Sequence, residues 1–100
     1  MPLFLVLLSS FDRSFKSLDP PQQEIVNLII KALGAYYASN CDLTTAQQIA
    51  PRFFYKQLRK PFYEAGVEGK LRIIIRRDEN QCNALMAGNH DQVKRFLMNQ

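Results

Sequence analysis

Residues 70–80 read KLRIIIRRDEN, a run of β-branched side chains interrupted by arginines, and this stretch decides the fold. Alternate side chains of a β-strand share a face, so two sets of side chains are predicted to emerge from it. One face carries Leu71, Ile73 and Ile75, and the other carries Arg72, Ile74 and Arg76. We expect the second set to look away from the helices that cover the sheet.

The arginine face has two interpretations. Arg72 and Arg76 would lie about 13 Å apart, at roughly 3.3 Å per residue, a spacing that suits successive phosphates along a nucleic-acid backbone. Alternatively, the arginines only keep an exposed sheet face soluble. In either case we expect Arg72→Ala to leave the fold intact, because an exposed side chain contributes little to stability.

Turn signals divide the second half of the chain into short strands. Lys60-Pro61, the glycines at 66 and 69, and the stretch 78–80 favour turns. We therefore predict strands near 62–68, 70–77 and 81–88, joined by tight hairpins. Connections this short require antiparallel pairing.

The first half begins with the apolar run PLFLVLL, which predicts a central strand over residues 3–8, covered on both faces. It is too short to span a bilayer and lacks the flanks of a signal peptide. Ser9-Ser10 is expected to cap a short helix, and Asp19 followed by two prolines to start a second helix ending near Asn40. Residues 44–50 and 90–98 also have helical spacing.

These elements predict one α+β domain over residues 1–100, in the order β-α-α-(α)-β-β-β-α. Its sheet is expected to be mainly antiparallel, with the two N-terminal helices and the last helix packed on one face.

Charge favours a polyanion or an acidic protein as the partner. The net charge is +4 and the pI about 9.3. Eight of the thirteen Lys and Arg lie between Arg52 and Arg77, opposed there only by Glu64 and Glu68. Nucleic-acid binding is therefore a hypothesis to test against geometry. The two cysteines form no CxxC motif, so we expect no metal, no cofactor and two reduced thiols in a cytoplasmic protein.

The same residues carry a resemblance to a known family. The KxL motif at 56–58, FYEAGVEG at 62–69, KLRIIIRRDEN, QCNALMAGNH at 81–90 and DQVKRFL at 91–97, in this order after two helices, resemble the RelE/ParE superfamily of bacterial toxins. The resemblance implies a toxin of a type II toxin-antitoxin system, held inactive by its cognate antitoxin. RelE-type members cut messenger RNA (mRNA) on the ribosome, whereas ParE-type members act on DNA gyrase.

Because one fold hosts both activities, the fold does not choose between them. We expect a RelE-like, ribosome-dependent mRNA endonuclease that inhibits translation. A ParE-like gyrase inhibitor without nuclease chemistry and a non-toxic small basic binding module stay open. No membrane partner is expected.

The resemblance also implies the site residues. Arg72, His90 and Lys56 match basic positions of RelE-like nucleases and are the expected catalytic residues for a metal-independent attack of a ribose 2′-hydroxyl on its phosphate. The residues expected to hold RNA phosphates are Arg76, Arg59, Lys60 and Lys70, and those expected to stack on bases are Tyr63 and Tyr55.

Two features depart from this assignment. The family type carries basic residues where this chain has Glu64 and Gly66, which removes two phosphate contacts. His90 also has a purely structural alternative, because its ring is in a position to cap the last helix or to bond Asp91.

Overall fold

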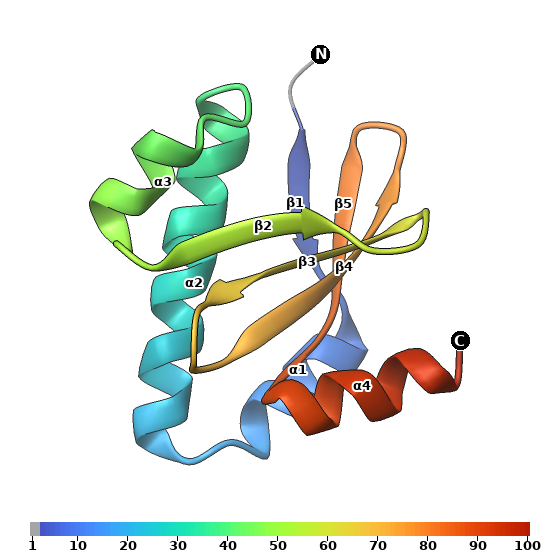
Figure 1. Cartoon of the computed structure of the whole chain (residues 1–100). Helices are drawn as coiled ribbons and strands as arrows, with labels where there is room; N and C mark the ends of the chain where they lie inside the picture. Colours follow the sequence, from blue (N-terminus) through green and yellow to red (C-terminus); the bar gives the residue numbers. More distant parts are fainter. Residues whose placement is uncertain (1–2) are drawn as a thin grey trace.

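A computed structural model describes residues 3–100 of the chain (Figure 1). The elements are β1 (Phe4–Leu7), α1 (Ser9–Lys16), α2 (Pro20–Ala38), α3 (Leu43–Ile49), β2 (Phe53–Gln57), β3 (Phe62–Val67), β4 (Arg72–Asp78), β5 (Gln81–Gly88) and α4 (His90–Met98). The mixed α+β class is confirmed. The two N-terminal helices, the further helical turns before Pro51 and the last helix all lie close to their predicted positions. None of the helices between residues 3 and 100 is both long and apolar enough to cross a membrane.

The strands form one sheet in the order β1-β5-β4-β3-β2. The pairs β2–β3, β3–β4 and β4–β5 are antiparallel hairpins, so the predicted hairpin region is confirmed. β1 pairs with β5 in parallel, with Leu5 aligned to Cys82. The sheet is therefore mainly antiparallel, with one parallel strand at its edge.

The prediction that the first strand is central was wrong, because β1 is an edge strand. Phe4 is 59% exposed and Leu7 42% exposed, while Leu3 and Leu5 pack partly against the core. An apolar run gives the tendency to form a strand, but it does not say how many neighbours the strand has. The position of β1 depends on its distant partner β5.

The serines after β1 do not cap α1 as predicted. The residue before the helix is Leu8, which makes no side-chain cap. Ser10 instead donates its hydroxyl to the Leu85 carbonyl at 2.7 Å, and the Ser14 hydroxyl accepts from the Ala87 amide at 2.9 Å. The hydrogen bonds of Ser10 and Ser14 therefore connect α1 to β5.

Asp19 caps α2 as predicted. Its carboxylate accepts from the Gln22 amide at 3.0 Å, while the Gln22 side chain accepts from the Asp19 amide at 3.1 Å. This reciprocal pair is a capping box, which satisfies two donors at the helix start. Gly34 lies inside α2 without ending it.

The sequence prediction missed one strand. Residues 53–57 form β2, which pairs with β3 over its whole length and is the other edge of the sheet. Phe53 and Tyr55 point to the core side, whereas Phe54 and Lys56 point to the other side. An aromatic run with interspersed cations hid this alternation.

α2 covers the sheet face that carries Ile73 and Ile75 of β4 and Ala65 of β3, all fully buried. At its edge the Tyr37 hydroxyl of α2 lies 2.9 Å from the Tyr55 hydroxyl of β2. Desolvation by burial raises the pKa of both tyrosine hydroxyls, so they remain neutral hydrogen-bonding groups.

The expectation that all helices cover one face was wrong for α4. Ile74 alternates with the core residues of β4 and belongs to the Arg72 face, yet it is fully buried. Val93 of α4 is buried as well, and α4 lines a hollow with Arg72 on that face. The Arg72 face is therefore partly covered, and Ile74 does not look away from all the helices.

Gly66 gives the first stability prediction, because β4 approaches it closely. A methyl group there would lie 2.6 Å from the Leu71 carbonyl and 2.9 Å from the Arg72 Cβ, whereas one at Gly34 would meet nothing within 4 Å. Gly66→Ala is expected to lower the free energy of unfolding by about 2 kcal/mol. The control Gly34→Ala is expected to raise it by about 0.5–1 kcal/mol. Urea unfolding measures both, and equal changes would contradict the close approach.

The two cysteines give the second prediction. Both are free; Cys82 is buried in β5 and Cys41 is exposed. Desolvation by burial raises the pKa of the Cys82 thiol, which disfavours the reactive thiolate. With a disulfide reagent at pH 8, one thiol per folded chain is expected to react quickly and a second only after unfolding in urea. Two fast thiols in the folded protein would contradict the buried position of Cys82.

Candidate functional site

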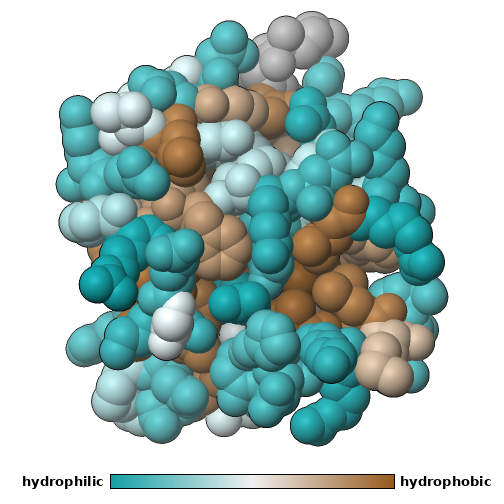
Figure 2. All heavy atoms as spheres, viewed as in Figure 1, coloured by the Kyte–Doolittle hydropathy of each residue, from teal (hydrophilic) through white to brown (hydrophobic). Residues whose placement is uncertain are grey.

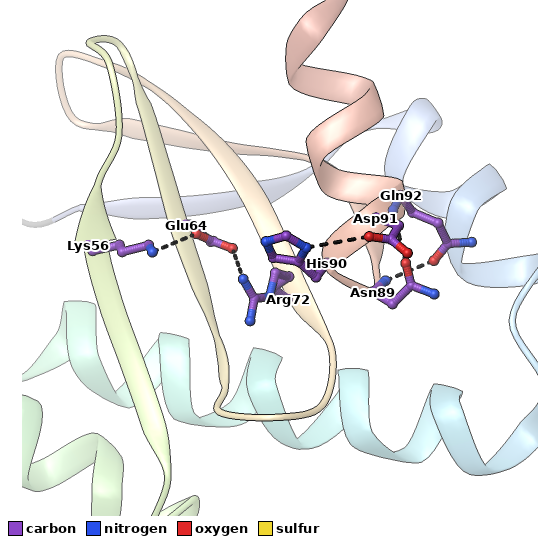
Figure 3. A network of polar contacts seen from close by, with 7 residues as sticks. All are labelled: Lys56, Glu64, Arg72, Asn89, His90, Asp91 and Gln92. Atoms are coloured by element: carbon purple, nitrogen blue, oxygen red, sulfur yellow. Dashed lines mark hydrogen bonds and ion pairs between the residues drawn. The ribbon is translucent and has the colours of Figure 1, made fainter.

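Three charged side chains from neighbouring strands form a continuous chain of contacts on the sheet face opposite α2. Glu64 of β3 lies between Lys56 of β2 and Arg72 of β4 (Figure 3). The Arg72 guanidinium donates from Nη1 to Glu64 Oε1 at 2.9 Å, and Lys56 Nζ lies 3.4 Å from Glu64 Oε2. One carboxylate therefore orients both cations.

Burial differs sharply along this chain of contacts. The Glu64 side chain is 4% exposed, Arg72 is 16% exposed and Lys56 is 57% exposed. A carboxylate leaves water at low cost only when cations and donors replace its hydration, and Arg72 and Lys56 supply them. Lys56, Glu64 and Arg72 together carry a formal net charge of +1.

His90 completes the group from the start of α4. A hollow of about 170 Å³ lies between α4 and the sheet. It is lined by Lys56, Glu64, Arg72, His90, Val93, Lys94 and Leu97. Figure 3 shows His90 on the same side of the sheet as Arg72. The structure therefore brings together all three predicted catalytic residues and adds Glu64 between them.

His90 does not cap α4. The cap is Asn89, whose side chain accepts from the Gln92 amide at 2.9 Å, while the Gln92 side chain accepts from the Asn89 amide at 2.8 Å (Figure 3). His90 is 68% exposed, with Nδ1 3.5 Å from Asp91 Oδ1. The imidazole is thus held beside the hollow with most of its surface open to solvent.

The Arg72 guanidinium is also positioned by an aromatic ring. Its Cζ lies 5.4 Å from the centre of the Phe54 ring, and Lys56 Nζ lies 5.8 Å from the same centre. Gly66 stands between Phe54 and Arg72 in the strand register, so no side chain separates them. Arg72 Nε is buried and has no hydrogen-bond partner among residues 3–100.

The residues predicted to hold flanking phosphates lie apart from one another. Arg76 is 54% exposed and contacts Asp78 at 3.6 Å, away from the hollow. Arg59 and Lys60 lie in the β2–β3 hairpin, whereas Lys70 lies in the β3–β4 turn at the opposite end of the strands. These cations do not form one compact cluster with Arg72.

Arg59 lines a different hollow, of about 310 Å³, together with Lys94. Its apolar lining comes from Leu58, Phe62, Leu97 and Met98. Figure 2 shows hydrophobic surface gathered in this region, between α4 and the β2–β3 hairpin, inside a largely hydrophilic face. The rim of this apolar hollow is cationic.

The tyrosines predicted to stack on bases are on the wrong side of the sheet for this site. Tyr55 bonds Tyr37 of α2, and Tyr63 stacks on Tyr55 with ring centres 5.6 Å apart. Both rings pack against the core. The aromatic side chain on the Arg72 side is Phe54.

Glu64 is the site residue that sequence reasoning treated only as a missing cation. A signal was present, since an acid inside a strand of otherwise apolar and small residues needs a cationic partner when that strand is buried. For metal binding, no group of three His, Cys, Asp or Glu comes together within the described part of the chain.

Known structures with the same arrangement identify the fold. The RelB-RelE antitoxin-toxin complex from Methanococcus jannaschii matches with a TM-score of 0.61 at 15% identity, over 91% of this chain and 96% of that chain. A copper-bound mutant toxin from Helicobacter pylori matches with a TM-score of 0.58 at 21% identity, over 91% and 98%.

The chain has the fold of the RelE/ParE-like toxins. A conserved hypothetical protein from Helicobacter pylori shares this RelE-like fold, with a TM-score of 0.52 at 21% identity over 91% of this chain and 98% of that chain. No family model and no curated protein sequence matches the chain. The resemblance inferred from the sequence is therefore confirmed at the level of the fold.

The Glu64–Arg72 pair corrects the expectation that Arg72→Ala leaves stability unchanged. Removing the guanidinium leaves a buried carboxylate with only the exposed Lys56 as partner. Arg72→Ala is expected to lower the free energy of unfolding by about 2–4 kcal/mol. The control Arg76→Ala, on the same strand with an exposed ion pair, is expected to cost about 0.5 kcal/mol or less. Similar losses in urea unfolding would show that the Glu64–Arg72 pair adds nothing.

Proposed function

We propose that this chain is the toxin of a toxin-antitoxin pair and cleaves mRNA on the ribosome, in the cytoplasm. The observation that supports this proposal most directly is the hollow lined by Lys56, Glu64, Arg72 and His90. It combines an acceptor for a proton, a donor of protons and fixed cations within one open site. These are the groups that ribose-assisted cleavage of RNA requires.

The reaction follows from the positions of these groups. A ribose 2′-hydroxyl attacks the adjacent phosphorus while its proton passes to the Glu64 carboxylate. The bond to the 5′-oxygen breaks, and His90 donates a proton to that leaving oxygen. The products are a 2′,3′-cyclic phosphate and a 5′-hydroxyl. His90 suits the acid role because its ring lines the hollow beside Arg72 and is mostly exposed to solvent.

Arg72 stabilises the crowded phosphate in this scheme. Only Nη1 of its guanidinium is bonded to Glu64, and a planar guanidinium presents N–H donors that match phosphate oxygens. Lys56, with its side chain more than half exposed, holds a flanking phosphate.

An antitoxin is the second partner that we propose. The Methanococcus jannaschii structure is described as an antitoxin-toxin complex. On this chain, the apolar hollow with Arg59 and Lys94 at its rim suits an acidic protein segment that buries apolar side chains. The net charge of +4 favours the same partner.

Gyrase inhibition without chemistry is a second candidate. One observation favours it: Glu64 occupies Arg72 and neutralises part of the positive charge that a phosphate would meet. In that case the charged hollow is a protein-binding surface, and host DNA damage would precede any loss of message.

The proposal predicts the outcome of induced expression in a bacterial host. Glu64→Gln and His90→Gln are each expected to reduce mRNA cleavage, mapped by primer extension, at least about 100-fold. The matched control Glu24→Gln, an exposed acid on α2, is expected to cleave normally. Antibody detection of each variant checks that its abundance is unchanged.

Three outcomes separate the alternatives. Cleavage that disappears in Glu64→Gln and His90→Gln supports the nuclease. DNA-damage induction with intact message supports the gyrase inhibitor, and no growth defect at normal abundance supports a non-toxic binding module. Full cleavage by His90→Gln would remove the histidine from the mechanism.

A further inference from the structure

Another hollow lies beside the one that contains Glu64 and His90, on the same face of the sheet. Its volume is about 260 Å³, and it is lined by Phe54, Lys56, Glu68 and Arg72. Lys56 and Arg72 also line the hollow that contains Glu64 and His90. Lys56 and Arg72 therefore stand between the two hollows. If they bind one phosphate of an RNA chain, the parts of the chain on either side of that phosphate would each face one hollow.

The lining of this hollow offers two planar groups against which a flat ligand can pack. Phe54 supplies an aromatic ring that is partly buried, and Arg72 supplies a planar guanidinium 5.4 Å from the ring centre. Unpaired nucleobases stack on both kinds of surface. A base next to a phosphate held by Lys56 and Arg72 would reach this lining, whereas Tyr55 and Tyr63 face the core on the other side.

Glu68 is the feature that the proposed chemistry does not use. Between Arg52 and Arg77 the only acids are Glu64 and Glu68, and Glu64 is paired with two cations and has the role of proton acceptor in the proposed reaction. No ion pair within residues 3–100 engages Glu68, and its side chain is exposed. Its backbone is fixed, because its amide donates to the Arg52 carbonyl at 3.1 Å. A carboxylate at this place repels a phosphate group but accepts hydrogen bonds from the N–H groups of a base.

We infer that the hollow between Phe54 and Glu68 is a base-binding subsite that selects guanine. This inference rests on the proposed function, since it takes RNA as the ligand of the neighbouring cations. The base packs against the side chains of Phe54 and Arg72, and the two Glu68 oxygens accept from its N1–H and its 2-amino group. Glu68 is thus a specificity-determining residue rather than a catalytic one.

The choice of guanine follows from donor geometry. A carboxylate accepts two hydrogen bonds side by side and donates none when ionised. On its Watson–Crick edge guanine presents two adjacent donors, whereas uracil, adenine and cytosine each present one donor beside an acceptor that Glu68 repels. The subsite is therefore expected to bind guanine best and uracil poorly.

Binding of short 2′-O-methyl oligonucleotides to the purified chain tests this subsite, because the blocked 2′-oxygen prevents cleavage. Fluorescence anisotropy with labelled tetranucleotides compares one guanine with one uracil in the same sequence. The unchanged chain is expected to bind the guanine form about ten-fold more tightly, the effect of one good pair of base contacts. Glu68→Gln is expected to reduce this ratio to about two-fold or less.

The matched control is Glu79→Gln. Glu79 is an exposed acid in the turn between β4 and β5, and it does not line either hollow. The Glu79→Gln variant is expected to keep the ten-fold preference for the guanine tetranucleotide. Phe54→Leu, which keeps an apolar side chain over Gly66, is expected to weaken both tetranucleotides by a similar factor.

The results separate this inference from the proposed function. No binding of either tetranucleotide, equal binding of the two by the unchanged chain, or an unaltered ratio in Glu68→Gln overturns the guanine subsite. A guanine preference that disappears only in Glu68→Gln supports it. If the guanine preference is present but no mRNA is cleaved after induced expression of the chain, the nuclease proposal is wrong and the guanine subsite is still supported.

Discussion

The ion pair between Glu64 and Arg72, extended to Lys56, is the interaction on which the candidate site depends. These side chains come from three adjacent strands, and their contacts exist only in the observed register. A slip of one residue in either hairpin would turn one partner toward α2, because side chains alternate between faces. The site is therefore specified by strand pairing as much as by its residues. A carboxylate that is almost fully buried makes a wrong register costly.

The sheet has two different faces, and this division separates stability from chemistry. The α2 side is a continuous apolar core with a tyrosine edge that burial keeps neutral. The other side carries charges between two hollows and is partly covered by α4, with Ile74 and Val93 both buried. Side chains in the hollows are therefore free to differ between proteins without disturbing the main core. One fold can in this way host several activities.

The sequence predicted features that depend on a few neighbouring residues. The Asp19 cap of α2, the short hairpins and the last helix are local, and each is close to its predicted place. It did not predict features set by distant partners. β1 is at an edge because its only strand neighbour is β5, and α4 partly covers the Arg72 face, where Val93 and Ile74 are both buried. β2 was missed because its aromatic and basic residues hide the alternation of its faces.

The same distinction applies to the site. The family resemblance identified Arg72, His90 and Lys56, and these three do line one hollow. The acid Glu64 inside a strand indicated that a cationic partner was needed, but strand neighbours decide that this partner is Arg72 and that Phe54 rather than Tyr55 lies on the same side. Those facts depend on which strands are neighbours and on where Gly66 leaves room between them.

The parallel pairing of β1 with β5 has a consequence for how this chain is made. Phe4 aligns with Gln81, and the hydroxyls of α1 bond Leu85 and Ala87. During translation β1 is therefore synthesised more than seventy residues before its partner β5 and stays unpaired until then. Contacts between segments so far apart slow folding, since the chain must close a long loop first. The sheet is therefore completed only once β5 has been synthesised and has paired with β1.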